Sequence, residues 1–231
     1  MFKFKQFAVR HDRCAMKVGT DGVLLGAWSD VTNACKVLDI GTGTGLVALM
    51  IAQRSPAAIT ALEIDADAFS QAKENIADSP WNDRIEVVHQ DFKTYTSNDK
   101  FDLIVSNPPY FVDSLLCPEE QRTVARHNGS LRYDELLNGV ARLLTDKGRF
   151  CVVIPMDASD ALHEIAANIG LYPSKQLIVI TAPGKQPKRT LIEFVFDSEV
   201  VCDKKELLLE EKRHQYSPEY IELTREYYLN L

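Results

Sequence analysis

The sequence predicts an α/β fold built on a mostly parallel sheet of seven strands, with an antiparallel hairpin near the C-terminus. The first observation is that short runs of aliphatic and β-branched residues alternate with helix-like segments between residues 36 and 169, as in βαβ units. The second is that the last two strand-like runs are joined by a loop too short for a crossover helix. These two runs are therefore expected to pair at an edge of the sheet.

Each expected element follows from its local pattern. The expected strands are 36–40, 59–64, 85–88, 101–105, 150–154, 177–181 and 191–196. They are short and apolar, as strands buried on both faces of a sheet are. The expected helices are 19–28, 46–53, 67–77, 133–144, 158–169 and 217–231. Thr20 or Asp21 suits the cap of the first helix, and Pro218 suits the first position of the last.

The composition is that of an ordinary globular protein, with 45% hydrophobic and 26% charged residues. It excludes a disordered or collagen-like chain. No window approaches the roughly 20 apolar residues of a membrane-spanning helix, and residues 1–13 lack the apolar run of a secretory signal. We expect one domain over residues 1–231, with an N-terminal arm and first helix in 1–30 and the core in 35–231.

The cysteines argue for a reduced, cytoplasmic protein without a metal centre. There are five of them: Cys14, Cys35, Cys117, Cys151 and Cys202. They are widely spaced, and none forms the C-x-x-C pair of a zinc or redox site. An odd number of scattered cysteines is typical of free thiols in the cytoplasm.

Positive charge is concentrated in two stretches, although the formal net charge is −7. The first holds Lys3, Lys5, Arg10, Arg13 and Lys17, and the second holds Lys175, Lys185, Lys188 and Arg189. The net charge argues against non-specific coating of nucleic acid. The two stretches either form a local phosphate-binding face or are solvated loops, and charge alone leaves both readings open.

A glycine-rich turn follows the first expected strand and opens the next helix. It runs from Asp39 through Gly41, Gly43 and Gly45, and Glu63 ends the second strand 22 positions after Gly41. Glycines let a ligand approach the backbone N–H groups at a helix start, and an acid at that distance can accept hydrogen bonds from ribose hydroxyls. The pattern predicts a cofactor that contains adenosine. The alternative is a tight turn with a surface glutamate.

The spacing of these glycines is G-x-G-x-G, which resembles the S-adenosylmethionine loop of Rossmann-like class I methyltransferases. That family places an acid near the adenine amino group at the end of the third strand, where Asp91 stands here. The resemblance also implies that Phe92 packs on the adenine face. Without the resemblance, Asp91 is nearly as well explained as an ordinary carboxylate at a strand end.

The tetrapeptide Asn107-Pro108-Pro109-Tyr110 follows the fourth expected strand. It resembles the motif of methyltransferases that act on planar amide or amine nitrogens. Such a nitrogen is a poor nucleophile because its lone pair is delocalised, and the Asn107 side-chain oxygen and the Pro108 carbonyl can accept its two hydrogens. Paired prolines hold these acceptors in place, and Tyr110 offers a ring on which the target base stacks. Asn107, Pro108 and Tyr110 are therefore the expected catalytic residues.

Further segments narrow the resemblance to the family of bacterial valine-tRNA adenine-N6 methyltransferases. These segments are 4–7, 11–22, 25–28, 79–81 and 216–217. The resemblance implies methylation of adenine 37, next to the anticodon of a valine tRNA, without an obligate protein partner. It also implies that Lys17, Thr20 and Asp21 contact the methionine part of the cofactor. Without the resemblance, the same segment is equally well explained as the cap of a helix.

The residues that follow the motif, 111–132, form a segment long enough to be functional in a compact domain. Arg122, Arg126, His127 and Arg132 lie in it. We expect them to grip the anticodon loop, with His127 contacting RNA or solvent rather than serving as a required base.

Other functions remain open at this point. A glutamine N5-methyltransferase that acts on a release factor carries a similar motif, but usually also a helical N-terminal domain for which residues before the first strand are too few. Guanine-N2 and DNA-adenine methyltransferases usually need further modules or inserts. A nicotinamide-dependent oxidoreductase would leave Asn107 to Tyr110 unexplained. A non-catalytic RNA-binding module that retains the cofactor is the last alternative.

Overall fold

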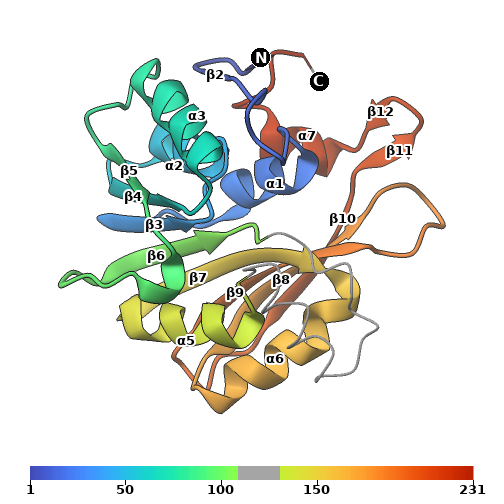
Figure 1. The fold of residues 1–231 in the computed structure, drawn as a ribbon. Helices are drawn as coiled ribbons and strands as arrows, with labels where there is room; N and C mark the ends of the chain where they lie inside the picture. The colour runs from blue at the N-terminus through green and yellow to red at the C-terminus, as the bar shows by residue number, and fades with distance from the viewer. Residues whose placement is uncertain (109–130, 231) are drawn as a thin grey trace.

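A computed structural model of the chain describes residues 1–108 and 131–230, and its core is a twisted sheet between two layers of helices (Figure 1). The sheet contains eight strands among the described residues, in the order β10-β8-β9-β7-β6-β3-β4-β5. These strands are β3 (Lys36–Ile40), β4 (Ala58–Glu63), β5 (Ile85–His89), β6 (Phe101–Ser106), β7 (Leu144–Pro155), β8 (Tyr172–Ile180), β9 (Arg189–Val195) and β10 (Asp203–Leu208). All neighbours pair in parallel except where β9 lies between β7 and β8.

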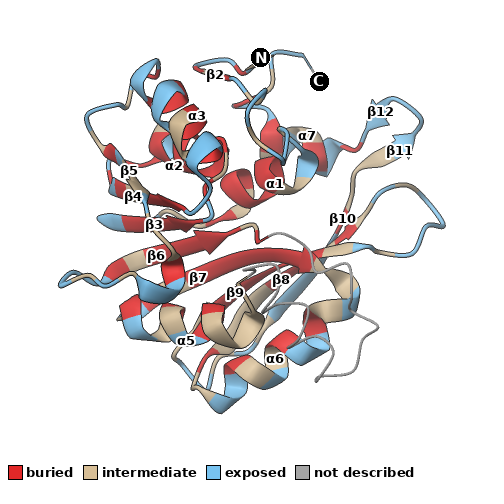
Figure 2. Cartoon of the chain, viewed as in Figure 1, coloured by how far each residue is buried: buried red, intermediate tan, exposed pale blue. Residues whose placement is uncertain are grey.

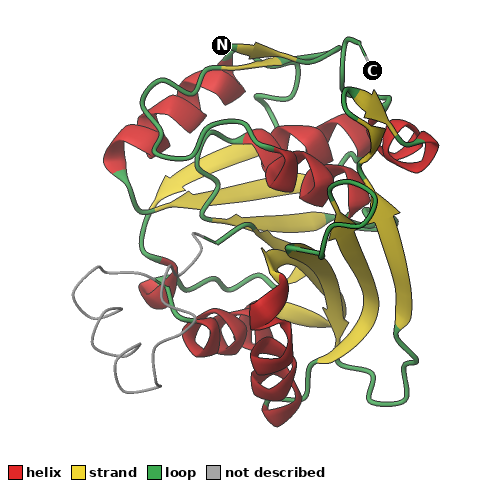
Figure 3. Cartoon of the chain, turned by 90° about the vertical axis from the view of Figure 1, so that its right-hand side faces the viewer, coloured by secondary structure: helices red, strands yellow, loops and turns green. Residues whose placement is uncertain are grey.

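The helices divide between the two faces of the sheet (Figures 1 and 3). One face carries α1 (Thr20–Trp28), α2 (Leu46–Arg54), α3 (Ala66–Ala77) and α7 (Pro218–Thr224). The other carries α5 (Tyr133–Leu143) and α6 (Ser159–Asn168), together with the short 3₁₀ helix η1 (Phe92–Thr94). Figure 2 shows that the central strands between these layers, such as β3, β6 and β9, are mostly buried, as expected for strands covered on both faces.

The predicted fold class is confirmed, but the strand count and the place of the hairpin were wrong. β8 and β9 do pair in antiparallel fashion, yet β10 pairs in parallel with β8 and makes the hairpin internal. β10 reads Asp-Lys-Lys-Glu-Leu-Leu, and only Leu207 in it is buried. A charged edge strand of this kind avoids pairing with other molecules and carries no apolar alternation that a sequence pattern would detect.

Several element ends also differ from those expected. Gly19, rather than Thr20 or Asp21, is the N-cap of α1, and no side chain caps the helix. The last helix, α7, ends at Thr224 instead of continuing to the C-terminus. Short strands absent from the prediction pair as β1 (Phe2–Lys3) with β2 (Ala8–Val9), and β11 (Glu210–Lys212) with β12 (Gln215–Tyr216).

The N-terminal arm is held on the body of the protein by the C-terminal segment, so that both ends of the chain lie close together (Figure 1). The Lys5 N–H donates to the Tyr227 carbonyl at 2.8 Å, and Phe4 pairs with Tyr228 in an isolated antiparallel β-bridge. Tyr227 is fully buried, its hydroxyl donates to the Met50 carbonyl of α2 at 3.2 Å, and burial raises its pKa to about 12.

None of the helices in the described ranges is long and apolar enough to cross a membrane.

Tyr227 provides a test of this anchoring. We expect Tyr227→Ala to lower the free energy of unfolding by about 3 to 5 kcal/mol, because it leaves a cavity under α2. Tyr227→Phe keeps the ring and loses the hydroxyl with its hydrogen bonds to Met50 and Arg54, so a loss of about 1 to 2 kcal/mol is expected. Urea denaturation followed by circular dichroism measures both values. Equal losses for the two variants would contradict a packing role for the ring.

Candidate active site

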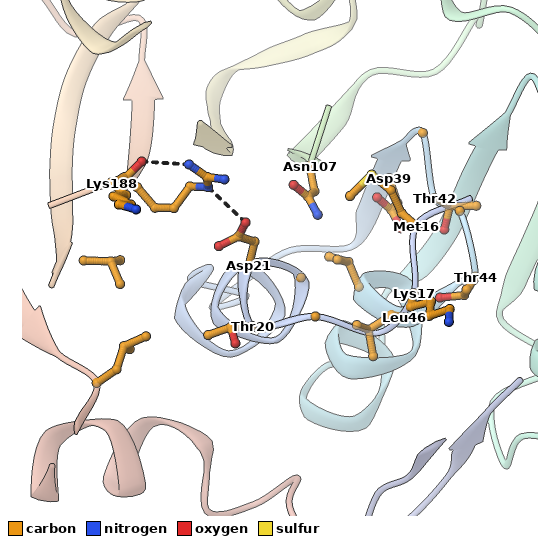
Figure 4. A pocket seen from close by; sticks show the side chains of 18 of the residues that line it. Met16, Lys17, Thr20, Asp21, Asp39, Thr42, Thr44, Leu46, Asn107 and Lys188 are labelled. Atoms are coloured by element: carbon orange, nitrogen blue, oxygen red, sulfur yellow. Dashed lines mark hydrogen bonds and ion pairs between the residues drawn. The ribbon is translucent and has the colours of Figure 1, made fainter. Parts of the chain in front are cut away.

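A cavity of about 390 Å³ opens at the edge of the sheet where the parallel strands end. The chain leaves β3 toward β4 on one side, while β6 lies on the other, so the cavity is at a topological switch point where ligands of such sheets bind. It is lined by Met16, Lys17, Gly19, Thr20, Asp21, Gly22, Asp39, Gly41, Thr42, Gly43, Thr44, Leu46, Val47, Asn107, Val179, Thr181, Lys188, Arg189 and Leu209, most of which Figure 4 draws as sticks.

The glycine turn forms the floor of the cavity in a conformation that side chains disfavour. Gly41, Gly43 and Gly45 have φ angles of 69°, 57° and 82°, all in the left-handed region. A Cβ built on Gly41 or Gly43 meets nothing within 4 Å, so the space above both residues is open to a ligand. Gly45 does not line the cavity, because it caps α2 and faces Ile76 of α3.

Glu63 braces this turn from beneath. Its Oε2 accepts the Gly43 N–H at 2.8 Å, while its Oε1 accepts the N–H groups of Ile64 and Asp65 at 2.9 Å. The side chain is buried and does not itself line the cavity. A carboxylate has about two acceptor positions on each oxygen, so Oε1 is fully used and one position remains on Oε2 for a ligand hydroxyl.

Asp39 lies in the cavity wall and is 1% exposed. Burial raises the pKa of its carboxyl to about 7, and the nearby Glu63 charge acts in the same direction. The Thr42 hydroxyl, which donates to Asp39 Oδ2 at 2.6 Å, and the Ala48 N–H in the first turn of α2 oppose this rise. The carboxyl is therefore poised to change its charge near neutral pH.

Asn107 points into the cavity from the end of β6 (Figure 4). The preceding Ser106 donates its hydroxyl to the Ile40 carbonyl at 3.0 Å and thereby ties the ends of β6 and β3 together. Asn107 Oδ1 is buried, and it accepts no hydrogen bond from any residue that the structure describes. A buried amide oxygen without a partner is costly, which makes it a prepared acceptor for a ligand N–H.

The sequence-predicted site residues fall into three groups. Seven of those expected to bind the cofactor line the cavity: Lys17, Thr20, Asp21, Asp39, Gly41, Gly43 and Asn107. Gly45, Glu63, Asp91, Phe92, Pro108 and Arg132 are described but do not line it. Tyr110, Arg122, Arg126 and His127 lie outside the described residues.

Asp91 and Phe92 have structural partners of their own. Asp91 caps η1 by accepting the Lys93 N–H at 2.9 Å. Phe92 is buried, and a Cβ on Gly139 of α5 would lie 2.5 Å from its ring. Ile64 was not predicted, although it follows Glu63 and is 56% exposed. Like Glu63, it does not itself line the cavity.

Arg132 is the N-cap residue of α5 rather than a free cation. It forms an ion pair with Asp134, and its backbone N–H donates to the Glu135 carboxylate at 3.0 Å. The Arg132 side chain thus already has a partner on its own helix, and this ion pair would compete with the expected contact to RNA.

One whole wall of the cavity was not predicted as cofactor-binding. It is formed by β8, β9, the loop between them and the segment after β10, through Val179, Thr181, Lys188, Arg189 and Leu209. Arg189 Nε lies 3.1 Å from Asp21 Oδ2 and so connects this wall to α1 (Figure 4). The only feature of the sequence that pointed to this wall was the basic stretch that contains Lys188 and Arg189.

No group of three or more His, Cys, Asp or Glu side chains that would suit a metal ion occurs in the parts of the chain that the structure describes. The residues of the cavity instead suit an adenosine-containing cofactor. The space above Gly41 and Gly43 is a cradle open to such a molecule, and Glu63 holds the turn beneath it. The Asn107 oxygen without a partner can accept a hydrogen from an amine at the end of the cofactor.

Comparison with known proteins gives a family that covers most of the chain. Residues 18–180 match the family described as methyltransferase small domain. The tRNA1(Val) (adenine(37)-N6)-methyltransferase of Bacteroides thetaiotaomicron is 65% identical over 232 residues, covering 100% of this chain and 98% of that protein. The proteins of the same name from Bacteroides fragilis and Aeromonas hydrophila are 62% and 46% identical, again over 100% of this chain and 98% of theirs.

Solved structures with the same fold are more distant. A predicted O-methyltransferase from Agrobacterium tumefaciens superposes with a TM-score of 0.68 at 18% identity, covering 92% of this chain and all of its own. A glycopeptide N-methyltransferase in complex with S-adenosyl-L-homocysteine gives a TM-score of 0.59 at 14% identity, covering 80% of this chain and 91% of its own. At these identities the likeness shows the fold alone.

Asp39 makes stability depend on pH. Its pKa rises from an ordinary value of 3.8 to about 7 on folding, so the folded chain holds the proton more tightly and the free energy of unfolding falls as pH rises between these values. Asp39→Asn keeps an acceptor for the Thr42 hydroxyl but cannot ionise, so its free energy of unfolding should not fall with pH for this reason. We expect the variant to gain stability relative to wild type by at most about 1.4 kcal/mol per pH unit across that range. Urea denaturation at several pH values measures the difference, and a constant difference would contradict the assignment.

Proposed function

Because this chain belongs to the family of tRNA1(Val) (adenine(37)-N6)-methyltransferases, we propose that it transfers a methyl group from S-adenosylmethionine to N6 of adenine 37 in a tRNA. The observation that carries this conclusion is identity of 62% to 65% with proteins of that name along the full chain. It is an enzyme, and its cofactor is S-adenosylmethionine.

When bound, S-adenosylmethionine supplies an electrophilic methyl group on a cationic sulfur. The protein must present the adenine amine to that methyl group with its lone pair free. The unpartnered Oδ1 of Asn107 accepts one amine hydrogen, which draws the lone pair out of conjugation with the ring. With the cofactor bound, the nitrogen would take the methyl group from sulfur, and the proton that the amine then loses would pass to water.

The other catalytic assignments extend this proposal. Pro108 is buried directly after Asn107, and its carbonyl serves as the second acceptor for the amine. We assign Tyr110 the stacking of the target base, from the sequence motif alone. Arg122, Arg126 and His127 keep their proposed contacts with the RNA on the same basis.

Supporting roles follow from the walls of the cavity. Lys17, Thr20 and Asp21 are proposed to hold the methionine part of the cofactor, because they line the cavity at the start of α1. Gly41, Gly43 and Asp39 are proposed to receive its central part. Around the adenosine, Glu63 is assigned to the ribose hydroxyls, Asp91 to the adenine amine, and Phe92 and Ile64 to the ring faces.

The valine isoacceptor and its anticodon loop are proposed as the substrate from the names of the relatives. The cytoplasm is the proposed location, since that is where tRNA is modified in bacteria. We also propose that residues 1–231 work as one domain, because the arm packs against α3 and the C-terminal segment.

The direct test is methyl transfer from radiolabelled S-adenosylmethionine to unmodified valine tRNA. A tRNA with guanine at position 37 is the matched control, and a release factor is offered in parallel. We expect label only in the first RNA, recovered as N6-methyladenosine. Label in the release factor alone would mean that the nitrogen chemistry is right and the substrate class wrong.

Asn107 tests the chemistry separately from binding. We expect Asn107→Ala to lower kcat by about 10²- to 10³-fold, as removal of one group that stabilises a transition state does. Affinity for S-adenosylmethionine, measured by calorimetry, should stay near that of wild type. Asn107→Asp retains an acceptor oxygen and should keep more activity than Asn107→Ala. Unchanged kcat in Asn107→Ala would refute the role.

Gly41 tests the cradle, with Gly170 as a matched control. Gly170 follows α6, has a φ of 79° and also has open space around a built Cβ, but it does not line the cavity. Alanine at either position should lower the free energy of unfolding by about 1 to 2 kcal/mol, because both need the left-handed conformation. Only Gly41→Ala should weaken S-adenosylmethionine binding, by tenfold or more. Equal affinities for the two variants would contradict the cradle.

A further inference from the structure

Four exposed cations lie on two segments that border the cavity on its unpredicted wall. Lys185 and Lys188 belong to the loop between β8 and β9, and Lys212 and Arg213 belong to the β11–β12 hairpin. We call these four residues the basic rim. The bases of the two segments are joined, because the Leu209 N–H donates to the Ile180 carbonyl at 2.8 Å and the Glu210 N–H to the Thr181 carbonyl at 3.2 Å.

The charge of the basic rim is available to a ligand. None of its four side chains forms an ion pair or hydrogen bond with any residue that the structure describes. The N-terminal basic stretch differs. Arg10 lies 2.7 Å from Asp78, and Arg13 forms an ion pair with Glu74, so α3 and its C-cap neutralise both arginines. In the second stretch Lys175 and Arg189 are also paired, with Glu193 and Asp21, so Lys185 and Lys188 supply its free positive charge beside the site.

The basic rim is continuous with the cavity. Lys188 lines it directly, as do Thr181 and Leu209, the residues at the bases of the two segments. A polymer whose reacting group enters the cavity beside Asn107 would pass over this wall. The rim is thus placed to meet the groups next to the reacting base.

The hairpin presents its cations at its tip. Arg213 and His214 form a two-residue turn between Lys212 and Gln215, and His214 has a φ of 63°. The acids of the hairpin, Glu210 and Glu211, stand at its start instead. Figure 1 shows this hairpin projecting from the body of the protein.

An aromatic ring accompanies the hairpin cations. Tyr216 of β12 is 40% exposed and leans on Tyr220 with ring centroids 5.0 Å apart. An exposed ring beside free cations is the combination that binds unpaired nucleotides, through stacking and phosphate contacts together.

We propose that the basic rim binds the phosphate backbone of the RNA on either side of the target adenine. This inference rests on the proposed function, since it names where that substrate is held. The net charge of −7 repels RNA from most of the surface, so four free cations gathered beside the cavity would also orient the RNA. Lysine and arginine contacts of this kind release counterions and give a strong dependence on salt.

The test is a rim variant, Lys185→Glu with Lys212→Glu and Arg213→Glu. Lys188 is left intact because it lines the cavity. We expect the KM for tRNA to rise at least tenfold, while kcat at saturating tRNA and affinity for S-adenosylmethionine stay within about twofold of wild type. The slope of the logarithm of tRNA affinity against that of salt concentration should become shallower by about one for each phosphate that the variant no longer neutralises.

The matched control is Lys73→Glu with Lys147→Glu and Lys204→Glu. These three lysines are also exposed and form no ion pair within the described parts of the chain, and the charge change is the same. They lie on α3 and near the starts of β7 and β10, away from the cavity. We expect this control variant to keep the wild-type KM for tRNA to within about threefold.

A KM for the rim variant within twofold of wild type, or an equal rise in the control variant, would overturn the inference and leave the proposed function intact, because wild type would still methylate tRNA. Absence of methyl transfer to tRNA by wild type would instead overturn the proposed function, and the inference with it.

Discussion

The site depends on one buried carboxylate, that of Glu63. Its two oxygens hold the N–H groups of Gly43, Ile64 and Asp65, so the end of β4 and the left-handed glycine turn after β3 form one unit. A carboxylate in charge-assisted hydrogen bonds to backbone N–H groups stabilises a backbone conformation that costs most residues free energy. The cavity floor is thereby shaped before any ligand arrives, and α2 begins with its positive end beside it.

A second constraint joins this floor to the reacting group. Ser106 fastens the end of β6 to Ile40 of β3, and the next residue, Asn107, is therefore delivered to the same cavity as the glycine turn. Asn107 Oδ1 has no partner in the described parts of the chain, and Asp39 beside it has a pKa raised to about 7 by burial. A buried oxygen without a hydrogen-bond donor and a buried carboxylate without a cation both lower stability. A bound substrate amine would supply the donor, and a cationic cofactor would supply the positive charge.

Charge is distributed in a way that serves an RNA substrate despite the acidic composition. Arg10 and Arg13 fasten the arm to α3, so their role is structural. The four cations of the basic rim have no such partners among the described residues, whereas Arg189 beside them pairs with Asp21 of α1. An anionic polymer approaching this protein would meet repulsion over most of its surface and attraction beside the site, which favours productive orientation over tight, unselective binding.

Short-range patterns determined much of this protein. The glycine turn, the Asn-Pro-Pro-Tyr motif and most strands were readable from the sequence, because backbone conformation and apolar runs are local properties. Tertiary structure alone decided that β10 extends the sheet, since its charged residues carry no strand signal. It alone decided that Val179, Thr181, Lys188, Arg189 and Leu209 close the cavity. It also decided which cations of the two basic stretches are paired with acids and which, such as Lys185 and Lys188, are not. These outcomes depend on contacts between residues far apart in the chain, which no local pattern records.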